Sequence, residues 1–178
     1  MEASPFFDGW QDCPRCAGPL EIEGSTASCS ACGRKVYANP APTASALVLD
    51  AQGRVLLARR AGDPGEGLWD LLGGFMEEGE EPLATLRREL EEETGTEIEP
   101  LEFLGGFPDR YGDGGIWTIN FYWTARILSG DPEPSDDVAA LEWFRPDELP
   151  PGGEFAFRNT VEVLQEWRAR ANGTSSEK

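Results

Sequence analysis

The sequence predicts an α+β fold, a sandwich in which a mixed β-sheet lies between helices, with a small cysteine-containing module ahead of it. Three observations predict this architecture. All four cysteines fall within residues 11–37, among glycines and prolines. Short apolar stretches bounded by turn residues then recur between residues 44 and 144. Two segments, 81–94 and 155–171, instead repeat their apolar residues with helical spacing.

Composition divides the chain into three parts. Residues 1–38 form the cysteine module with an N-terminal extension, whose first ten residues are expected to be a loose end unless Phe6, Phe7 and Trp10 pack against another part of the chain. The stretch ANPAPT (38–43) favours an extended linker because of its prolines, and the second domain is expected over residues 39–171. Residues 172–178, NGTSSEK, are expected to be a disordered tail.

The strands of the second domain are expected to begin with a hairpin around the turn AQG. A later segment, IWTINFYWTARIL, is rich in aromatic and β-branched residues and is typical of a long strand. It follows the glycine-rich turn DRYGDGG. The expected strands cover residues 44–50, 54–60, 97–107, 116–128 and 138–144, and residues 68–75 pass from strand into loop.

The first expected helix, 81–94, has Pro82 in its first turn and Gly95 directly after it, where glycine commonly ends a helix. The face that we expect to pack on the sheet carries Leu83, Leu86 and Leu90. The second helix, 155–171, also spaces its apolar residues for one face. These residues are Phe157, Val161, Leu164 and Trp167.

The charge of the chain disfavours several classes of partner. Thirty-three acidic residues against 15 basic ones give a formal charge of −18. A negative net charge disfavours binding to nucleic acids, which requires basic residues that neutralise phosphates. It also disfavours binding to an anionic membrane surface. No apolar run reaches the length of about 18 residues that a membrane span needs. Without the features of a secretory signal at the N-terminus, the expected location is the reducing cytoplasm.

The spacing of the cysteines predicts a zinc site. Cys13 and Cys16 are separated by two residues, and so are Cys29 and Cys32. Four thiolates complete the tetrahedron that zinc prefers and leave no position for water or substrate, which predicts a structural Zn²⁺. Two disulfides are the alternative, which a reducing compartment disfavours. Ribbons of this kind also dock nucleic acid, although few basic residues surround these cysteines.

The helix at 81–94 concentrates carboxylates on one side. Glu89, Glu92 and Glu93 are spaced i, i+3, i+4 and share one face. Clustered carboxylates without a cation raise one another's pKa. Hard cations such as Mg²⁺ or Mn²⁺ prefer oxygen ligands and would make this clustering favourable. The chain has no histidine, so a metal outside the cysteine module must be held by oxygen. A solvated acidic helix is the alternative that the spacing alone leaves open.

The segment around this helix resembles the Nudix box, G-x5-E-x7-R-E-U-x-E-E-x-G-U, in which U is a bulky aliphatic residue. The matching residues are Gly74, Glu80, Arg88, Glu89, Leu90, Glu92, Glu93 and Gly95. All fixed polar and glycine positions match, and the one departure is Thr96 at the last aliphatic position. Flanking segments extend the resemblance over residues 40–170.

The resemblance implies the Nudix α/β/α sandwich and metal-dependent hydrolysis of a phosphoanhydride bond. The substrate implied is a nucleoside diphosphate linked to another moiety. A catalytic Mg²⁺ or Mn²⁺ is implied at Glu89, Glu92, Glu93 and the Gly73 carbonyl. Glu92 or Glu93 is implied to orient or deprotonate the attacking water. Arg88 is implied to fix a glutamate of the box through a charge-assisted hydrogen bond.

A zinc ribbon ahead of a Nudix domain resembles the NADH pyrophosphatases. Their Ser-Gln-Pro-Trp-Pro-type signature is missing from GGFPDRYGDGG (105–115), where only Pro108 matches. The sequence therefore leaves dinucleotides, ADP-ribose-like sugar nucleotides and nucleoside triphosphates open as substrates. The residues expected to bind substrate are Arg59, Arg60, Gly74, Trp69 and Tyr111. An ordinary surface location for the arginines and core packing for the aromatic residues are the alternatives.

Two further residue pairs and two functional classes stay open. Phe107 and Trp117 are candidates for stacking on a base, and the loop residues Asp136 and Asp137 are candidates for a further metal site. The complete set of box carboxylates favours an active hydrolase. The alternative is a non-catalytic Nudix module that binds nucleotides, with a ribbon that docks a partner or nucleic acid. Analogy with other Nudix proteins suggests a homodimer.

Overall fold

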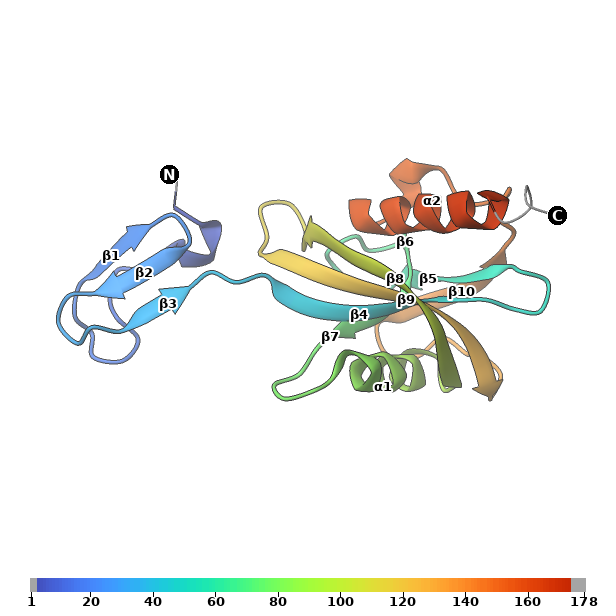
Figure 1. Ribbon diagram of the computed structural model, residues 1–178, viewed down its shortest axis with the longest axis horizontal. Helices are drawn as coiled ribbons and strands as arrows, with labels where there is room; N and C mark the ends of the chain where they lie inside the picture. Colours follow the sequence, from blue (N-terminus) through green and yellow to red (C-terminus); the bar gives the residue numbers. More distant parts are fainter. Residues whose placement is uncertain (1–2, 174–178) are drawn as a thin grey trace.

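The computed structural model describes residues 3–173 and confirms an α+β fold (Figure 1). A small three-stranded unit precedes a larger body of two sheets. Two helices, α1 (Pro82–Thr94) and α2 (Arg158–Gly173), lie on opposite sides of the strands of this body. The predicted tail overlaps the end of α2, and residues 174–178 lie outside the described residues. No helix within residues 3–173 is long and apolar enough to cross a membrane.

The N-terminal unit is an antiparallel sheet with an aromatic cluster on its extension. Its elements are η1 (Pro5–Phe7), β1 (Leu20–Glu23), β2 (Thr26–Cys29) and β3 (Lys35–Tyr37). Phe7 is buried, and its ring lies 5.1 Å from that of Phe6 and 5.5 Å from that of Trp10. The Ser4 N–H donates to the Gly24 carbonyl over 2.8 Å. The extension is therefore attached to the sheet and is not a loose end.

The larger body contains a mixed four-stranded sheet in the order β7-β4-β9-β8. Its strands are β4 (Ala41–Val48), β7 (Leu72–Phe75), β8 (Glu97–Arg110) and β9 (Trp117–Ser129). β4 and β9 run parallel, and the other two pairings are antiparallel. Because β4 begins at Ala41, only residues 38–40 join the two parts of the chain, and the expected linker is half strand.

A second sheet has the order β10-β5-β6. Its strands are β5 (Val55–Arg60), β6 (Trp69–Asp70) and β10 (Val138–Phe144). The predicted hairpin of residues 44–50 and 54–60 is present only at its turn, where Leu49 and Val55 form one antiparallel bridge, because β4 and β5 belong to different sheets. Both edges of β4 are already paired, with β7 and β9, so β5 pairs elsewhere.

The helix α1 closes one side of the mixed sheet. Gly95 follows it with φ 69°, the left-handed conformation that ends many helices. Leu86 and Leu90 are fully buried in a cluster with β4, β7 and β9, as predicted. Leu83 is 36% exposed and lies outside this cluster, which corrects that part of the prediction.

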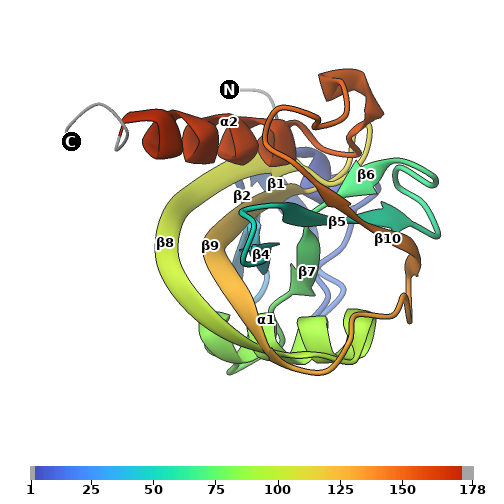
Figure 2. The same cartoon turned by 90° about the vertical axis from the view of Figure 1, so that its right-hand side faces the viewer.

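The helix α2 covers the other side of the body, and Figure 2 shows it across the curved strands β8 and β9 from α1. A short 3-10 helix, η2 (Gly152–Glu154), precedes it. Val163, Leu164 and Trp167 are buried in a second cluster with residues of β4, β5 and β9. Phe157, expected on the same apolar face, instead lines a cavity between α2 and the sheets.

Candidate active site

The acidic helix α1 meets strand β7 at two consecutive glycines. Glu93 is 6% exposed, and one of its carboxylate oxygens accepts a 2.8 Å hydrogen bond from the Gly73 N–H. Gly73 has φ 133°, and a Cβ there would collide with the β4 backbone at Ala44 and Ser45. A glycine is therefore required for β7 to approach β4 closely while its backbone faces α1.

The next glycine leaves space for a second carboxylate of the box. A Cβ on Gly74 would lie about 2.5 Å from the carboxylate atoms of Glu89. The missing side chain therefore creates a cradle in which this carboxylate rests against the strand backbone. Glu89 and Glu93 thus converge on the Gly73–Gly74 backbone from one face of α1, as their i, i+4 spacing predicts.

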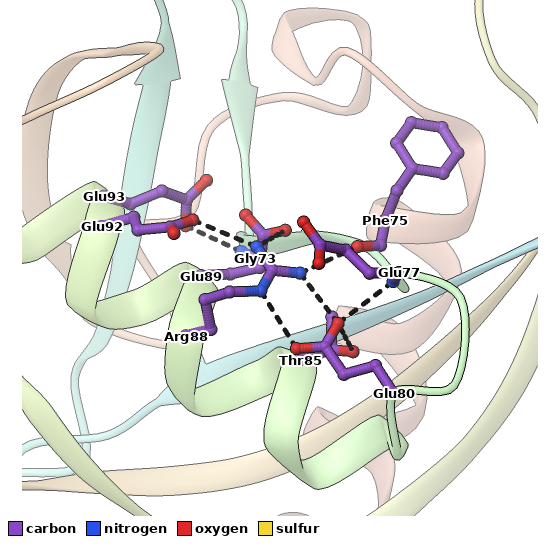
Figure 3. A network of polar contacts seen from close by, with 9 residues as sticks. All are labelled: Gly73, Phe75, Glu77, Glu80, Thr85, Arg88, Glu89, Glu92 and Glu93. Atoms are coloured by element: carbon purple, nitrogen blue, oxygen red, sulfur yellow. Dashed lines mark hydrogen bonds and ion pairs between the residues drawn. The ribbon is translucent and has the colours of Figure 1, made fainter.

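Arg88 holds the glutamates of the box in place (Figure 3). Its guanidinium donates to both oxygens of Glu80, over 3.0 and 2.9 Å, and to the Phe75 carbonyl over 3.1 Å. The same group donates to Glu89 over 2.8 Å and to Glu92 over 3.1 Å. One arginine therefore connects β7, the loop before α1 and three carboxylates.

Glu80 completes this network at the start of the helix. One of its oxygens accepts hydrogen bonds from the Thr85 hydroxyl, over 2.6 Å, and from the Glu77 N–H, over 3.0 Å. The hydrogen bonds from Arg88, together with these, lower the pKa of Glu80 to about 2. Glu80 is therefore a fixed anion that stabilises the loop before α1.

Glu92 occupies a different environment from its two neighbours. Its side chain is 49% exposed and pairs with Arg88, and it is not among the residues that line the cavity described below. Among residues 3–173, the four cysteines are the one group of at least three potential metal ligands that lie close together, with all donor atoms within 4.8 Å of one another. The three glutamates do not meet this condition. They therefore share a face without forming a closed cluster.

Burial raises the pKa of the two carboxyls that face the glycines. Burial is the main cause for Glu93, whose pKa lies well above its ordinary value, and the charges of Asp137 and Glu89 add to it. Burial also raises the pKa of Glu89, against the opposing effect of Arg88. Anionic groups held in this way are destabilised unless a cation reaches them.

These carboxylates lie at a cavity of about 220 Å³ that the two sheets and the start of α2 enclose. Six acidic residues line it: Asp70, Glu89, Glu93, Asp109, Asp136 and Asp137. The loop before β10 reaches the cavity because the Ser135 N–H donates to the backbone carbonyl of Glu93 over 2.9 Å. The sequence left this loop open between a solvated position and the site, and it lines the site.

Arg60 is the one basic residue among those lining the cavity. Its guanidinium donates to the Pro64 carbonyl over 2.7 Å and lies 3.6 Å from the Asp70 carboxylate. It also lies 5.4 Å from the centre of the Phe157 ring, which stacks on Tyr111 at 5.6 Å. The Arg60 guanidinium thus lies against the rings of Phe157 and Tyr111 and beside the carboxylate of Asp70.

The residues expected to bind substrate divide into two groups. Arg60, Gly74 and Tyr111 line the cavity. Arg59 is exposed, donates to the Gly67 carbonyl over 3.0 Å and lies over the ring of Trp69. Trp69 is 5% exposed and belongs to the second core cluster, so the core alternative is the correct one for it.

The remaining aromatic candidates also lie outside the cavity lining. Phe107 packs against the second core cluster, with its ring 5.8 Å from that of Tyr122. Trp117 is 45% exposed, and the guanidinium of Arg110 lies 4.6 Å from its ring. Successive residues in a strand point to opposite faces of the sheet. The sequence did not identify the face on which the cavity lies, so it could not separate Arg59 from Arg60.

Sequence reasoning missed several residues of the cavity, among them Asp70 and Asp109. Burial raises the pKa of Asp70 to about 6, although the Thr160 hydroxyl donates to it over 2.7 Å. Asp109 accepts a 2.9 Å hydrogen bond from the Asn159 N–H at the start of α2. The available signal was Asp70 itself, a charged residue within the apolar segment 68–75, three residues before the glycine pair.

The four cysteines come together as their spacing predicts. Their sulfurs all lie within 4.8 Å of one another, with Cys13 to Cys32 at 3.8 Å and Cys16 to Cys29 at 3.6 Å. The cysteines are free thiols rather than disulfides. The Arg15 N–H donates to the Cys13 sulfur, and this bond lowers the pKa of Cys13 to about 7. Four thiols in this arrangement suit a tetrahedral Zn²⁺.

The donor set at the glycine pair suits a hard divalent cation. Carboxylate and carbonyl oxygens are the ligands that Mg²⁺ and Mn²⁺ prefer. Two half-buried or buried glutamates with raised pKa values, and the cradle at Gly74 that no Cβ fills, provide such oxygens beside the cavity. The residues therefore fit a divalent cation at this end of the cavity.

Comparisons with known proteins agree with this geometry. A family model described as NUDIX domain matches residues 39–164. The human mitochondrial NAD(P)H pyrophosphatase NUDT13 is 32% identical over 149 residues, which cover 81% of this chain and 41% of that protein. The NAD-capped RNA hydrolase NudC of Chromobacterium violaceum is 29% identical over 152 residues, or 82% of this chain and 54% of that protein. The chain thus spans about half the length of these relatives.

A shorter relative and two solved structures are also similar. The ADP-ribose pyrophosphatase of Methanocaldococcus jannaschii is 30% identical over 118 residues, which cover 65% of this chain and 68% of that protein. A NUDIX hydrolase from Nitrosomonas europaea superposes with a TM-score of 0.71 at 25% identity, covering 86% of this chain and 88% of the other. The NUDIX domain of Shewanella oneidensis NrtR, complexed with ADP ribose, gives 0.60 at 25% identity, covering 75% and 89%.

Proposed function

The chain belongs to the NUDIX domain family, and on that premise we propose that it is a metal-dependent hydrolase of a phosphoanhydride bond. Its substrate is a nucleoside diphosphate linked to another moiety, a class that includes dinucleotides, ADP-ribose-like sugar nucleotides and nucleoside triphosphates. One observation carries the proposal. Glu89 and Glu93 converge on the Gly73–Gly74 backbone at the end of a cavity that also holds a single arginine on aromatic rings.

The metal ligands in this proposal are Glu89, Glu92, Glu93 and the Gly73 carbonyl. When bound there, Mg²⁺ or Mn²⁺ neutralises phosphate oxygens and lowers the pKa of the attacking water. Glu89 and Glu93 already face the cavity. Glu92 is engaged by Arg88 at 3.1 Å, so its contribution is the part of the ligand set that an experiment must separate from that of Glu93.

The chain's own residues supply the other requirements of hydrolysis. Glu93 or Glu92 accepts a proton from the attacking water. Arg60 offsets charge on the substrate diphosphate. Tyr111 offers an aromatic surface to the moiety beyond the diphosphate. Arg88 keeps Glu80 and Glu89 in position and so preserves the geometry of the site.

The names of the relatives narrow the substrates to test. The three relatives described above are named for their action on NAD(P)H, NAD-capped RNA and ADP-ribose. Each of these compounds contains a ribose-linked diphosphate, which is the common chemistry that we propose for this chain. A nucleic acid is a weaker candidate here because six carboxylates line the cavity and the chain carries a charge of −18.

The N-terminal unit has a structural role in this proposal. We place the zinc ribbon at residues 1–38 and the hydrolase domain at residues 39–171, with Zn²⁺ held by the four cysteines. A site with four protein ligands has no open position, so Zn²⁺ stabilises the small unit and takes no part in hydrolysis. Free thiols favour a reducing compartment, which is consistent with the cytoplasm. A homodimer stays a proposal by analogy.

The test is a substrate panel with purified full-length protein. NADH, NAD⁺, ADP-ribose and ATP are each incubated with Mg²⁺ or Mn²⁺, and the products are separated by chromatography. We expect metal-dependent cleavage of at least one diphosphate, and its loss in both Glu92→Gln and Glu93→Gln while the folded spectrum is unchanged. Full turnover in both variants would contradict the assignment. Nucleotide binding by calorimetry without any cleavage would instead indicate the non-catalytic binding module.

A further inference from the structure

A second part of the cavity lining carries no charge. Thr43 on β4 and Thr118 and Asn120 on β9 line it side by side. We call these three residues the polar wall. They are 6%, 3% and 8% exposed, so the surface that they retain is small and belongs to the cavity. Strand pairing places Thr43 directly opposite Asn120, which fixes both side chains in the same layer.

The orientation of the Asn120 amide follows from its partners. Its nitrogen lies 3.1 Å from the Phe107 carbonyl, which can only accept a hydrogen bond. The amide oxygen cannot take this position without placing two acceptors together, so the nitrogen must face Phe107. The second hydrogen of that nitrogen goes to the Thr118 hydroxyl over 2.9 Å. Both donors of Asn120 are therefore used inside the protein.

The two threonines have also used their hydrogens. The Thr118 hydroxyl accepts from Asn120 and donates to the Asp109 carbonyl over 3.2 Å. The Thr43 hydroxyl donates to the Asn120 side-chain oxygen over 2.6 Å. Every polar hydrogen of the three side chains thus has a partner in the protein. The free positions that remain on the polar wall are all lone pairs, on the oxygen of Asn120 and on the hydroxyls of Thr43 and Thr118.

We propose that the polar wall determines specificity by recognising a hydrogen-bond donor on the nucleotide, either a ribose hydroxyl or an exocyclic amino group. This inference rests on the proposed function and identifies the substrate class of the same site. A ligand that places an acceptor or an apolar atom against the polar wall leaves its lone pairs unpaired, and is rejected. Deoxyribose and oxo-purine analogues are the compounds that this rule distinguishes from the natural ribonucleotides of adenine.

The size of the effect follows from the chemistry of the contact. Sites built to hydrogen-bond a substrate hydroxyl or amino group discriminate more strongly than apolar pockets that differ by one methylene group. A single neutral hydrogen bond corresponds to a factor of about 10 in kcat/KM, and two to a factor of about 100. The hydrogen bond to the polar wall is made in the bound ground state as well as in the transition state. Its loss is therefore expected to raise KM and to leave kcat nearly unchanged.

The experiment compares substrate pairs that differ by one donor. Whichever of NADH, ADP-ribose and ATP is cleaved is compared with its hypoxanthine analogue, which lacks the amino group, and with its 2′-deoxy analogue. The wild-type protein is expected to have an at least tenfold lower kcat/KM for one of the two analogues. The affected analogue identifies the donor. In Asn120→Ala, kcat/KM for the natural compound is expected to exceed that for the affected analogue by no more than about twofold, because KM for the natural compound rises.

A matched control separates specificity from loss of stability. Thr124→Val changes another buried hydroxyl on the same strand, 7% exposed and outside the cavity lining, and is expected to keep the wild-type ratio. Equal kcat/KM for both analogues and the natural compound in the wild-type protein would overturn the inference, whether or not Asn120→Ala folds. An unchanged ratio in folded Asn120→Ala would overturn it as well.

A different result identifies failure of the proposed function. If the wild-type protein cleaves none of the compounds, calorimetric titration with the same pairs in the presence of Mg²⁺ tests the polar wall by binding alone. An at least tenfold weaker Kd for one analogue then supports the inference without catalysis. Equal Kd values, or no binding of any of these nucleotides, overturn it.

Discussion

The cysteine cluster and the carboxylate site are both built from side chains that sequence spacing brings together, but they differ in closure. The four sulfurs lie within 4.8 Å of one another, so their geometry is complete without further movement. At the other site Glu89 and Glu93 face a cavity of about 220 Å³, while Glu92 points to Arg88. The first arrangement can surround an ion with protein ligands on all sides, whereas the second leaves an open cavity beside its carboxylates.

This difference in closure separates a stabilising site from a reactive one. The thiols belong to a unit with a small core of its own, in which a bound ion replaces hydrophobic burial. The carboxylates belong to a body that already buries two clusters of apolar side chains. That body can hold Glu93 in a destabilised, buried state because the surrounding packing maintains the fold. Each of the following experiments changes one side of this comparison.

The largest effect is expected from removing a zinc ligand. Cys29→Ser is expected to abolish stoichiometric zinc binding and to unfold the ribbon, because structural zinc contributes about 10 kcal/mol or more to folding. Metal analysis and amide hydrogen exchange over residues 11–37 measure the loss. Besides residues 38–40, the two parts meet at a small pocket that Pro5 and Phe6 line together with Trp117, so the melting temperature of the larger body should change little. A parallel decrease in that melting temperature would show that the two regions are coupled.

Glu93→Gln is expected to produce the next largest effect. The substitution keeps the size of the side chain but removes a metal ligand and a base, so kcat should fall at least about 10³-fold. Because a buried charge is removed, the metal-free variant should unfold at a higher temperature than the wild-type protein. Chromatographic rates and thermal unfolding measure the two effects. A loss of activity together with a loss of stability would instead assign Glu93 a structural role.

The buried Asp70 predicts a dependence of stability on pH. Its pKa rises from an ordinary 3.8 to about 6 in the folded protein, mainly because of burial. The folded state therefore binds more protons than the unfolded state between these values, and stability falls as the pH rises from about 4 to about 6. This difference of about two pKa units corresponds to about 3 kcal/mol.

Asp70→Asn measures this contribution. The variant should be more stable than the wild-type protein at pH 8 and nearly equal to it at pH 4, in urea unfolding of the metal-free protein. Asn retains an oxygen that can accept from the Thr160 hydroxyl and the Leu71 N–H. A difference in stability that does not vary between pH 4 and pH 8 would contradict the raised pKa.

Gly74→Ala is expected to affect activity more than stability. The new Cβ meets the flexible end of Glu89, about 2.5 Å away, and displaces that carboxylate. A misplaced ligand of this kind should lower kcat by about 10-fold to 100-fold. Gly73→Ala is the contrasting variant, because its Cβ meets the β4 backbone and should destabilise the fold. If both variants lose only stability, the cradle for Glu89 has no role in catalysis.

The smallest effect is expected at Arg59. This exposed residue stacks on Trp69 outside the cavity lining, and such a contact contributes about 0.5–1 kcal/mol. Arg59→Ala should therefore leave KM within about twofold of the wild-type value, whereas Arg60→Ala should raise it. Steady-state kinetics on one substrate compare the two variants. A larger rise in KM for Arg59→Ala would mean that the substrate extends beyond the cavity.

The elements that depend on neighbouring residues were predictable from the sequence. The helix α1, its termination at Gly95 and the long strand β9 lie within two residues of their expected positions. The partners of β5 were not predictable, because its pairing depends on strands that are distant in the sequence and that occupy both edges of β4. The exposure of Leu83 has the same origin, since the width of the sheet decides how much of a helix face is covered.

The types of ligand and their spacing can be read from the sequence alone. Fixed offsets place Glu89 and Glu93 on one helix face and pair the four cysteines, because helix geometry and tight turns act over a few residues. The tertiary structure alone decided which arginine faces the cavity, that Asp70 is buried, and that Thr43 lies opposite Asn120. These features depend on contacts between distant segments, and no local spacing encodes them.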